Sequence, residues 1–476
     1  MPTTSLTAPD LPLLLEGAGG SQSSRLHAGL RAAILGGRLP AGLRLPSSRA
    51  LATQLGLRRN AVIAAYEQLL SDGLAEARTG AGTFVAPRLP QGPSEPAPLP
   101  VSPAPPSEAP AQAPFAIGRT LPDQALLNQF GRLMRRHLAR ADPIHFGYGD
   151  PRGSEALRAA IAAHLAATRG ILCDPARILI TSGTRHGLRL CAETLLRPGD
   201  AVWMEDPGYP SARQILDSVG ARLVPVPVDA AGLDAAEGRR RAPAARMAYV
   251  TPSHQFPTGV TMSMPRRLAL LDWAREADAW VLEDDYDSEF RYAGPPLTAL
   301  AGIDRQARVI YLGTFSKTLF PGLRIGYLVL PPALLPAIAT ARAAVDRFPP
   351  SLLSGALAEL VSGGGFAAHV RRMRSRYRAA RDRVAETLTR TSEGALRVAV
   401  PDQGLHLLAL LPEDLPPGAA RAIRAAAGVE GWLLSDTRIV QGGPDGFVLG
   451  FSGHPLPALE RAAERLGRAC REAARE

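Results

Sequence analysis

The sequence contains very little lysine. Of its 54 Lys and Arg residues, Lys317 is the one lysine and all the others are arginine. Arginine stays charged at physiological pH, whereas lysine can lose its proton and react as a primary amine. A chain that uses arginine wherever a cation is enough has therefore kept one lysine, within GTFSKTLFPG (313–322). This pattern makes Lys317 a candidate for covalent chemistry; the alternative is a surface lysine that survived by chance.

Cysteine and long apolar runs are also scarce. The three cysteines, Cys173, Cys191 and Cys470, are far apart and form no CxxC pair. Their spacing argues against a disulfide framework or a cysteine zinc site, and it fits a reducing cytoplasm. No run of 18 apolar residues is present, and the N-terminus lacks the basic region of a secretory signal. We therefore expect a cytoplasmic protein without a membrane span or metal site, with two or three domains in its 476 residues.

A proline-rich segment divides the chain. Eleven of the 28 residues from 87 to 114 are proline. Such a composition cannot form a core, and it predicts an extended, semi-rigid linker. The linker separates a small N-terminal domain, residues 20–86, from a large C-terminal one, residues 115–476.

The N-terminal unit has the pattern of three helices and a hairpin. Apolar residues recur at helical spacing over 26–34, and LPSSRALATQLG (45–56) predicts a second helix with a serine at its N-cap. LRRNAVIAAYEQLL (57–70) predicts a third helix with an exposed Arg/Asn start, and 74–85 predicts a β-hairpin. This order is the plan of a winged helix-turn-helix. The net charge of +10 permits nucleic-acid binding, although a generally arginine-rich surface would produce it equally well.

Residues 45–86 resemble the winged helix of the GntR family, most specifically in LPSSRALA and in GAGTFV. The resemblance implies double-stranded DNA as a partner. The DNA contacts that it implies are Arg44, Ser48, Arg49, Arg58, Arg59, Asn60, Gly80 and Thr83. The family usually has Ser or Thr at the position of Arg58 and Thr at that of Ala61, so we expect DNA binding with an altered base preference. An amphipathic dimerisation module is the alternative.

The C-terminal unit alternates strand-like and helical segments, which predicts an α/β domain with a largely parallel sheet. Strands are predicted at 177–181, 201–205, 222–228, 246–250, 279–282, 309–312 and 326–330, and helices at 153–168, 185–196 and 266–276. After Pro332 the pattern changes and predicts a smaller α+β subdomain over about 333–476. Its predicted elements are helices at 366–389 and 456–474 and strands at 396–400, 406–411 and 446–451.

Four motifs that follow predicted strands carry chemistry. Thr181–Thr184 opens a helix, where free N–H groups and hydroxyls can bind a phosphate. Tyr209, in EDPGYP, can stack on a flat ring, and Asp284, in VLEDDYD, needs a cationic partner such as a protonated pyridine nitrogen. Together with Lys317 these groups describe a site for pyridoxal 5′-phosphate (PLP). Taken singly, they could also be a helix cap, a packing tyrosine and solvated loop acids.

Residues from about 115 to 470 resemble a fold-type I aminotransferase domain, because several motifs occur in the same order. The motifs are GYGDPRGSEALRAAIAAHL, ITSGTRHGL, EDPGYP, TPSHQFPTG, EDDYDSEFRY and GTFSKTLFPGLRIGY. Joined to the GntR-like unit, they resemble the MocR/GabR family of transcription regulators. The resemblance implies that Lys317 forms the Schiff base with PLP, Asp284 pairs with the pyridine nitrogen, Tyr286 bonds the ring hydroxyl and Tyr209 stacks on the ring. It implies a phosphate site made of Ser182, Gly183, Thr184, Ser316 and Arg324, with Thr314 nearby. It also implies a homodimer, in which Tyr148 reaches the partner's site.

Two positions depart from the aminotransferase pattern. Phe256 stands where an N-P-x-G element usually has Asn, and Val448 stands where an R-L-x-F run usually has the arginine that grips an α-carboxylate. Arg438 is a weak candidate to replace that arginine. We therefore expect a transcription regulator whose promoter binding responds to PLP or to a small amine captured by it, with little or no transaminase turnover. A working aminotransferase with an accessory DNA-binding-like domain is the alternative, and a scaffold with a vestigial PLP fold is a weaker one.

Overall fold

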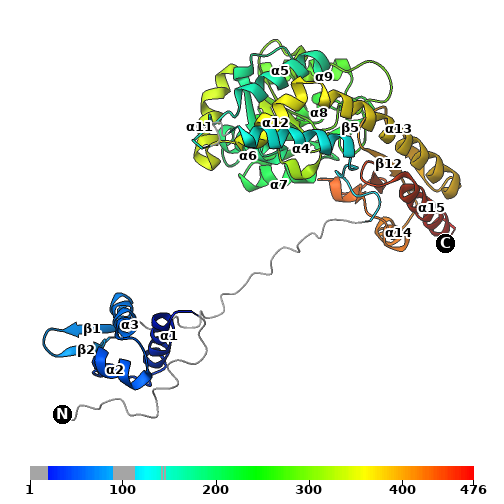
Figure 1. Ribbon diagram of the computed structural model, residues 1–476. Helices are drawn as coiled ribbons and strands as arrows, with labels where there is room; N and C mark the ends of the chain where they lie inside the picture. The colour runs from blue at the N-terminus through cyan, green and yellow to red at the C-terminus, as the bar shows by residue number, and fades with distance from the viewer. Residues whose placement is uncertain (1–19, 89–112, 141–142, 144–145, 476) are drawn as a thin grey trace. The chain divides into compact units, whose positions relative to one another are not determined.

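The computed structural model describes residues 20–88, 113–140, 143 and 146–475 (Figure 1). The chain separates into two compact units, one within residues 1–108 and the other within 109–476. Most of the proline-rich segment 87–114 lies outside the described residues, so its extended form stays a prediction.

The N-terminal unit is a winged helix-turn-helix, as predicted. Its elements are α1 (Gln22–Leu35), α2 (Ser48–Leu55), α3 (Arg59–Ser71), β1 (Ala75–Arg78) and β2 (Gly82–Val85). Leu26, Leu30 and Ile34 are fully buried and form one core with apolar residues of α2, α3 and the hairpin. The Ser47 hydroxyl caps α2 by accepting the Ala50 N–H at 3.2 Å. The fold of this unit could be predicted from sequence because its core forms within about 60 contiguous residues, so local signals are enough.

Helix α3 begins without a side-chain cap. Arg58 is its N-cap residue, and no hydrogen bond from its side chain to the first turn is present among the described residues. A Ser, Thr or Asp at an N-cap accepts an N–H bond that Arg cannot accept, and this capping is worth about 1 kcal/mol. We therefore expect Arg58→Thr to slow amide hydrogen exchange in α3 of the full-length protein by about fivefold, the factor that 1 kcal/mol represents. The matched control is Arg59→Thr, one residue inside the helix; unchanged or faster exchange in Arg58→Thr would contradict the expectation.

The C-terminal unit is built on an eight-stranded sheet with the order β3-β10-β9-β8-β7-β4-β5-β6. Its strands are β3 (Ile178–Thr181), β4 (Ala201–Asp206), β5 (Arg222–Asp229), β6 (Gly232–Leu233), β7 (Met247–Val250), β8 (Trp280–Asp285), β9 (Val309–Thr314) and β10 (Gly326–Val329). The five central strands β5, β4, β7, β8 and β9 are parallel, and β10 runs antiparallel to both of its neighbours. The expected mostly parallel sheet is confirmed.

Helices cover both faces of this sheet (Figure 1). Val202 and Met204 of β4 point into the apolar layer beneath α6 (Thr184–Leu195), α7 (Pro210–Ser218) and α11 (Leu335–Asp346). Ala201 and Trp203 point into the opposite layer. That layer is covered by α8 (Ala235–Arg241) and α9 (Met264–Glu276), and α5 (Glu155–Arg169) packs beyond them with α4 (Gln124–Ala139) and α12 (Ser351–Ser362). Burial on both faces explains why the strands are nearly continuous apolar runs.

A smaller antiparallel sheet follows in the chain, with the order β11-β12-β14-β13. Its elements are β11 (Arg397–Ala399), β12 (His406–Leu410), β13 (Trp432–Leu433) and β14 (Gly446–Gly450), with α13 (Gly365–Ser392), α14 (Ala419–Ala427) and α15 (Leu456–Ala473) packed around them. The sequence pattern predicted all of these except α14 and β13. The two-residue strand β13 is too short for any periodicity to show.

Strand β8 is longer than predicted. It was expected to end at Leu282 but continues to Asp285, so three acidic residues are buried in a strand where a solvated loop was one interpretation. Two of them are fully partnered: Glu283 accepts the Leu300 and Ala301 N–H groups at 2.8 Å, and Asp285 pairs with Arg169 at 2.8 Å, whereas Asp284 is bonded through Oδ2 alone. A buried carboxylate is costly when it lacks partners, which is why acidic residues usually end a strand. Here hydrogen bonds and an ion pair offset that cost, so the strand continues.

Within the described ranges, no single helix has the length and hydropathy of a membrane span. The neighbours α12 and α13 meet that criterion only when taken together, and they are bent by 73° at the break between them.

Candidate functional site

A cavity of about 140 Å³ lies at the carboxyl ends of β4, β7, β8 and β9, between the large sheet and the small subdomain. The predicted residues Lys317, Asp284, Tyr286, Tyr209 and Thr184 all line it. The other lining residues are Ile117, Gly118, Tyr249, Thr251, Phe256, Leu405, His406 and Trp432. Parallel strands place their carboxyl ends at one edge, which is why motifs scattered over more than a hundred residues meet here.

The Lys317 side chain is half-buried and its amine opens into the cavity. Its Nζ donates one long hydrogen bond, 3.4 Å, to the carbonyl of Gly118. Burial lowers the pKa of Lys317, while the nearby carboxylates of Asp287 and Asp284 act in the opposite direction. A lowered pKa increases the fraction of neutral amine, which is the form that attacks a carbonyl carbon. Gly118 has a φ of 80°, and a Cβ at this position would collide with Nζ.

Asp284 is buried at the floor of the cavity. Its Oδ2 accepts the Tyr249 hydroxyl at 2.6 Å, whereas Oδ1 is buried and finds no hydrogen-bond partner in the described part of the chain. Burial raises the pKa of Asp284 to about 7, and the bond from Tyr249 opposes that shift. An orphaned buried carboxylate oxygen is costly unless a ligand supplies a donor. A protonated pyridine nitrogen supplies both a donor and a positive charge, so Asp284 fits the ring of PLP.

The start of α6 offers a phosphate site. Gly183 is the N-cap, with a φ of 97° and no side chain to cap the helix, so the helix begins at Thr184 with free N–H groups. The Arg324 guanidinium lies beside Gly183, 3.7 Å from where a Cβ would stand. Ser182 is half-buried next to them. Amide donors, a helix N-terminus and a cation together suit a phosphate dianion.

The turn after β9 adds a hydroxyl. The Ser316 Oγ is buried and has no hydrogen-bond partner within the described ranges, while its N–H is held by the Thr314 Oγ1 at 3.1 Å. An unpartnered hydroxyl one residue before Lys317 is a second orphan that a phosphate oxygen could satisfy. The polar groups of this chain therefore fit the cofactor at both its ring and its phosphate.

Aromatic rings form the walls of the cavity. Tyr209 lies nearly parallel to Trp432, with ring centroids 6.3 Å apart and an interplanar angle of 6°. Phe256 meets both rings edge-on, at 5.5 Å and 5.4 Å. Tyr286 donates its hydroxyl to the carbonyl of His254 at 3.1 Å, which fixes its ring in the wall. Sequence reasoning missed Trp432, because no motif marks it and it lies on the short strand β13.

A buried polar layer supports Tyr286 from behind. The Nδ1 of His254 pairs with Asp287 Oδ2 at 3.0 Å, and the Nε2 of His406 lies 3.2 Å from the carbonyl of Pro257. The ligating atoms of His254, Asp287 and His406 fall within 4.8 Å of one another. The Nε2 of His406 faces a carbonyl oxygen and therefore carries a proton, so this nitrogen has no lone pair for a metal, and the Nδ1 of His254 is engaged by Asp287. Their hydrogen bonds position the cavity wall, and we assign no metal to them.

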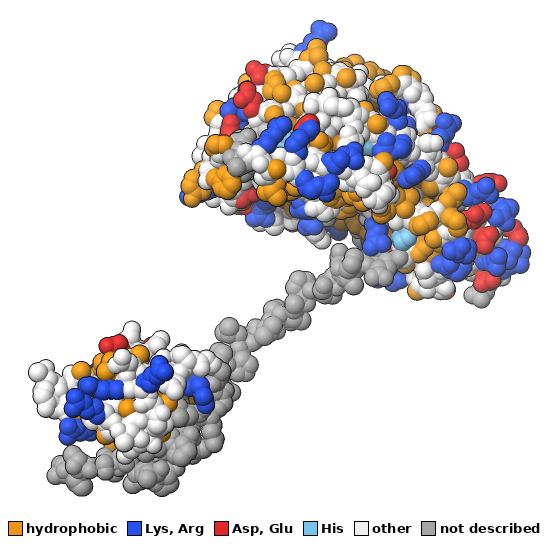
Figure 2. Space-filling model, viewed as in Figure 1, with side chains coloured by type: hydrophobic (Ala, Val, Ile, Leu, Met, Phe, Trp, Pro, Cys, Tyr) orange, Lys and Arg blue, Asp and Glu red, His pale blue; other side chains and the backbone are white. Residues whose placement is uncertain are grey.

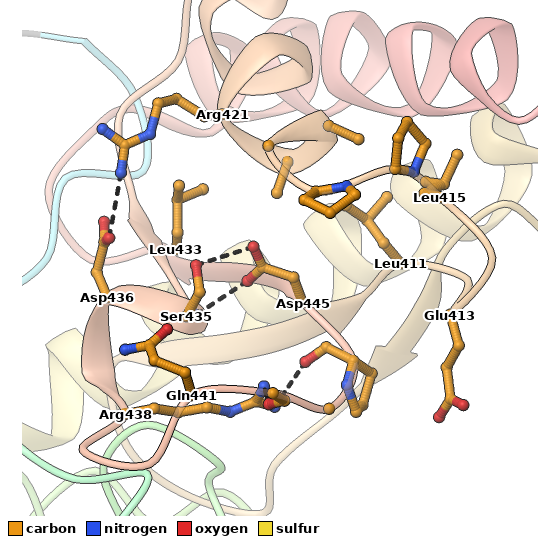
Figure 3. A pocket seen from close by; sticks show the side chains of 18 of the residues that line it. Leu411, Glu413, Leu415, Arg421, Leu433, Ser435, Asp436, Arg438, Gln441 and Asp445 are labelled. Carbon is orange, nitrogen blue, oxygen red and sulfur yellow. Dashed lines mark hydrogen bonds and ion pairs between the residues drawn. The ribbon is translucent and has the colours of Figure 1, made fainter.

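The departures from the aminotransferase pattern lie against the aromatic wall. Val448 is fully buried and packs with Phe256, Leu408 and Leu434. Arg438 does not compensate, because it lines a different and larger cavity of about 820 Å³ in the small subdomain (Figure 3). There its guanidinium donates to the carbonyls of Gly442 and Pro444.

The predicted DNA contacts lie on the surface of the winged helix. Six of the eight predicted positions are exposed, and Figure 2 shows several arginines gathered on one face of this unit. The exposed residues among those predicted are Arg44, Arg49, Arg58, Arg59, Asn60 and Gly80, and the half-buried ones are Ser48 and Thr83. The Arg59 Nε bonds the Ser48 Oγ at 3.4 Å and so joins the starts of α3 and α2. Arg44 pairs with Phe84 of the wing through a backbone bridge.

Each of the two units matches a known protein family. Residues 22–85 match the family of bacterial regulatory proteins of the gntR type, and residues 115–439 match the class I and II aminotransferases. The chain is 38% identical over 444 residues to the probable rhizopine catabolism regulatory protein MocR of Rhizobium meliloti, covering 90% of each. It is 34% identical over 434 residues to the pyridoxine biosynthesis transcriptional regulator PdxR of Corynebacterium glutamicum, covering 90% of this chain and 92% of the relative.

A crystal structure of kynurenine aminotransferase from Pyrococcus horikoshii, in complex with PMP, shares the fold of the C-terminal unit. It is 26% identical, superimposes with a TM-score of 0.70, and covers 76% of this chain and 91% of that one. The fold and this neighbour imply a pyridoxal phosphate cofactor, and the gntR-type unit implies DNA binding. The chain belongs to the MocR family of transcription regulators, in which a GntR-type winged helix is joined to a domain of the class I and II aminotransferase fold.

Proposed function

We propose that the Lys317 cavity is the sensor of this regulator: PLP, or an amine held beside it, occupies the cavity and changes promoter binding by a homodimer. The observation that carries the proposal is the pair of orphaned buried oxygens near the chain's one lysine: Asp284 Oδ1, in the cavity that Lys317 also lines, and the Oγ of Ser316, the residue before Lys317 in the chain. PLP supplies an aldehyde that an amine can capture and a ring that withdraws electrons.

The residues of this chain take separate parts in the proposal. Lys317 attaches the cofactor through Nζ, and Asp284 holds a proton on the ring nitrogen. Tyr286 bonds the ring hydroxyl and Tyr209 covers the ring face. The start of α6, with Arg324, binds the phosphate. Tyr148, which is 82% exposed, is available to reach the partner subunit's cavity.

We further propose that transaminase turnover is small or absent. An α-amino acid needs a cation for its carboxylate, and Val448 with its apolar neighbours supplies none. The intact set of Lys317, Asp284, Tyr286 and Tyr209 favours the second candidate function, a working aminotransferase. Multiple turnover with an amino donor and a keto acceptor would establish that candidate.

The test is a gel shift on the DNA upstream of the gene, using apo protein, protein with PLP, and Lys317→Ala with PLP. We expect PLP to change the affinity of the wild type at least fivefold and to leave the variant unchanged, since regulatory couplings are typically about 1–3 kcal/mol. Lys317→Arg is the matched control, because it keeps a cation but cannot attach the cofactor. If the protein retards the DNA equally with and without PLP, the signal must be an amine and not PLP itself. The absence of specific retardation in every arm would favour the enzyme.

A further inference from the structure

We propose that the part of the cavity beside the cofactor position selects a primary amine with an apolar body and no carboxylate. This inference rests on the proposed function, because it names the chemical class of ligand that signals at the Lys317 cavity. It follows from the register of the small sheet, from the charges around the cavity and from the aromatic walls.

The register of the small sheet places an apolar row behind one wall of the cavity, the wall to which Trp432 and Phe256 contribute. Val448 on β14 lies directly opposite Leu408 on β12 and opposite Trp432 on β13. Residues opposite one another on antiparallel strands carry their side chains on the same face. The three side chains therefore form one continuous row, and Phe256 packs against it from the large sheet. Val448, Phe256 and Leu408 are 0%, 4% and 6% exposed, so water does not separate them.

The charges around the cavity disfavour an anion. Lys317 is the one basic side chain among the described residues that line it, apart from His406, which burial holds neutral by lowering its pKa well below the usual range. Asp284 lies on the floor, and the Glu205 carboxyl lies behind it, bonded to the Thr251 hydroxyl at 2.6 Å. When Lys317 is attached to the cofactor, a carboxylate that entered this space would lose its water without gaining a cation from the side chains that line the cavity. The same surroundings favour an ammonium group.

The aromatic walls suit the body of such a ligand. Tyr209, Trp432 and Phe256 all line the cavity, with the rings of Tyr209 and Trp432 nearly parallel and that of Phe256 edge-on to both. Aromatic faces attract both flat apolar groups and ammonium cations. The cavity of about 140 Å³ also has to accept the cofactor ring, so the ligand beside it must be small.

Two probes test whether the site prefers an amine without a carboxylate. Phenethylamine and L-phenylalanine share one skeleton and differ only by the carboxylate. We would titrate each into full-length protein loaded with PLP, and follow the cofactor absorbance together with the fluorescence of Trp432 against a Trp432→Phe control. We expect phenethylamine to half-saturate the protein at a concentration at least tenfold lower than L-phenylalanine. Equal binding, tighter binding of the amino acid, or binding of neither probe would overturn the proposal.

A pair of variants tests the cause of the preference. Val448→Arg places a cation opposite Leu408 and Trp432 and should narrow or reverse the tenfold preference, whereas Val448→Leu should retain it. The wild-type comparison decides the proposal even if the arginine variant fails to fold. A gel shift with each probe separates this inference from the proposed function: an amine preference without any change in DNA affinity supports the site and rejects its regulatory role.

Discussion

Lys317→Arg is expected to carry no pyridoxyl group after incubation with PLP and reduction with borohydride, whereas the wild type should carry one per chain. Arginine keeps the positive charge but has no primary amine that can be captured at neutral pH. The burial that lowers the pKa of Lys317 makes its amine more reactive than an exposed lysine. Mass spectrometry of the intact chain and of its peptides measures the attachment.

The composition of the chain makes the labelled position unambiguous. Because no other lysine exists in the sequence, a pyridoxyl group fixed on any lysine must be at position 317. The α-amino group of the chain is the remaining primary amine and serves as the internal control for non-specific labelling. A wild-type chain labelled only at its N-terminus, or a Lys317→Arg chain labelled as fully as the wild type, would contradict the assignment.

Asp284→Asn is expected to weaken the retention of PLP by about 100-fold, because removing one partner of a buried charge pair costs about 3 kcal/mol. The amide keeps the size of the side chain and can still accept the Tyr249 hydroxyl, which lies 2.6 Å from Oδ2. It cannot hold a proton on the pyridine nitrogen by charge. Equilibrium dialysis, or the thermal shift that added PLP produces, measures the loss. The exposed Asp217→Asn, on α7, is the matched control.

The apo protein should respond to the same substitution in the opposite sense. The pKa of Asp284 is about 7 in the folded state, above its value in an unfolded chain. The folded state therefore retains a proton that the unfolded state has lost between about pH 4 and pH 7. Asp284 thus makes the apo protein less stable as pH rises through that window, and the penalty is constant above it. At pH 8 the apo Asp284→Asn chain should unfold at the same temperature as the wild type or higher. A lower unfolding temperature with an unchanged pH slope would show that the carboxylate has another partner.

Sequence reasoning found residues that the structure brings together in one cavity, because the signals that mark them are local. The residues predicted to hold the cofactor follow strand ends, where Thr181–Thr184, EDPGYP, VLEDDYD and GTFSKTLFPG each combine turn residues with one functional group. In a parallel sheet, strand ends meet at one edge, so the order of motifs along the chain was enough to place them in one site. The fold class followed from the same alternation of strands and helices. The winged helix followed from capping and periodicity within a short segment.

The tertiary structure decided what surrounds those groups. Trp432 reaches the cavity from a two-residue strand, and Tyr249 reaches Asp284 from a neighbouring strand; neither position has a signal in its own segment. The acidic end of β8 remained a strand because Arg169 and the Leu300 and Ala301 amides satisfy its carboxylates from distant parts of the chain. The sequence by itself determined which residues have the functional groups to attach and polarise a cofactor, since that depends on the kinds of group and their local spacing. Only the tertiary structure decided which ligand can sit beside the cofactor, because that depends on which faces of separate strands are brought together.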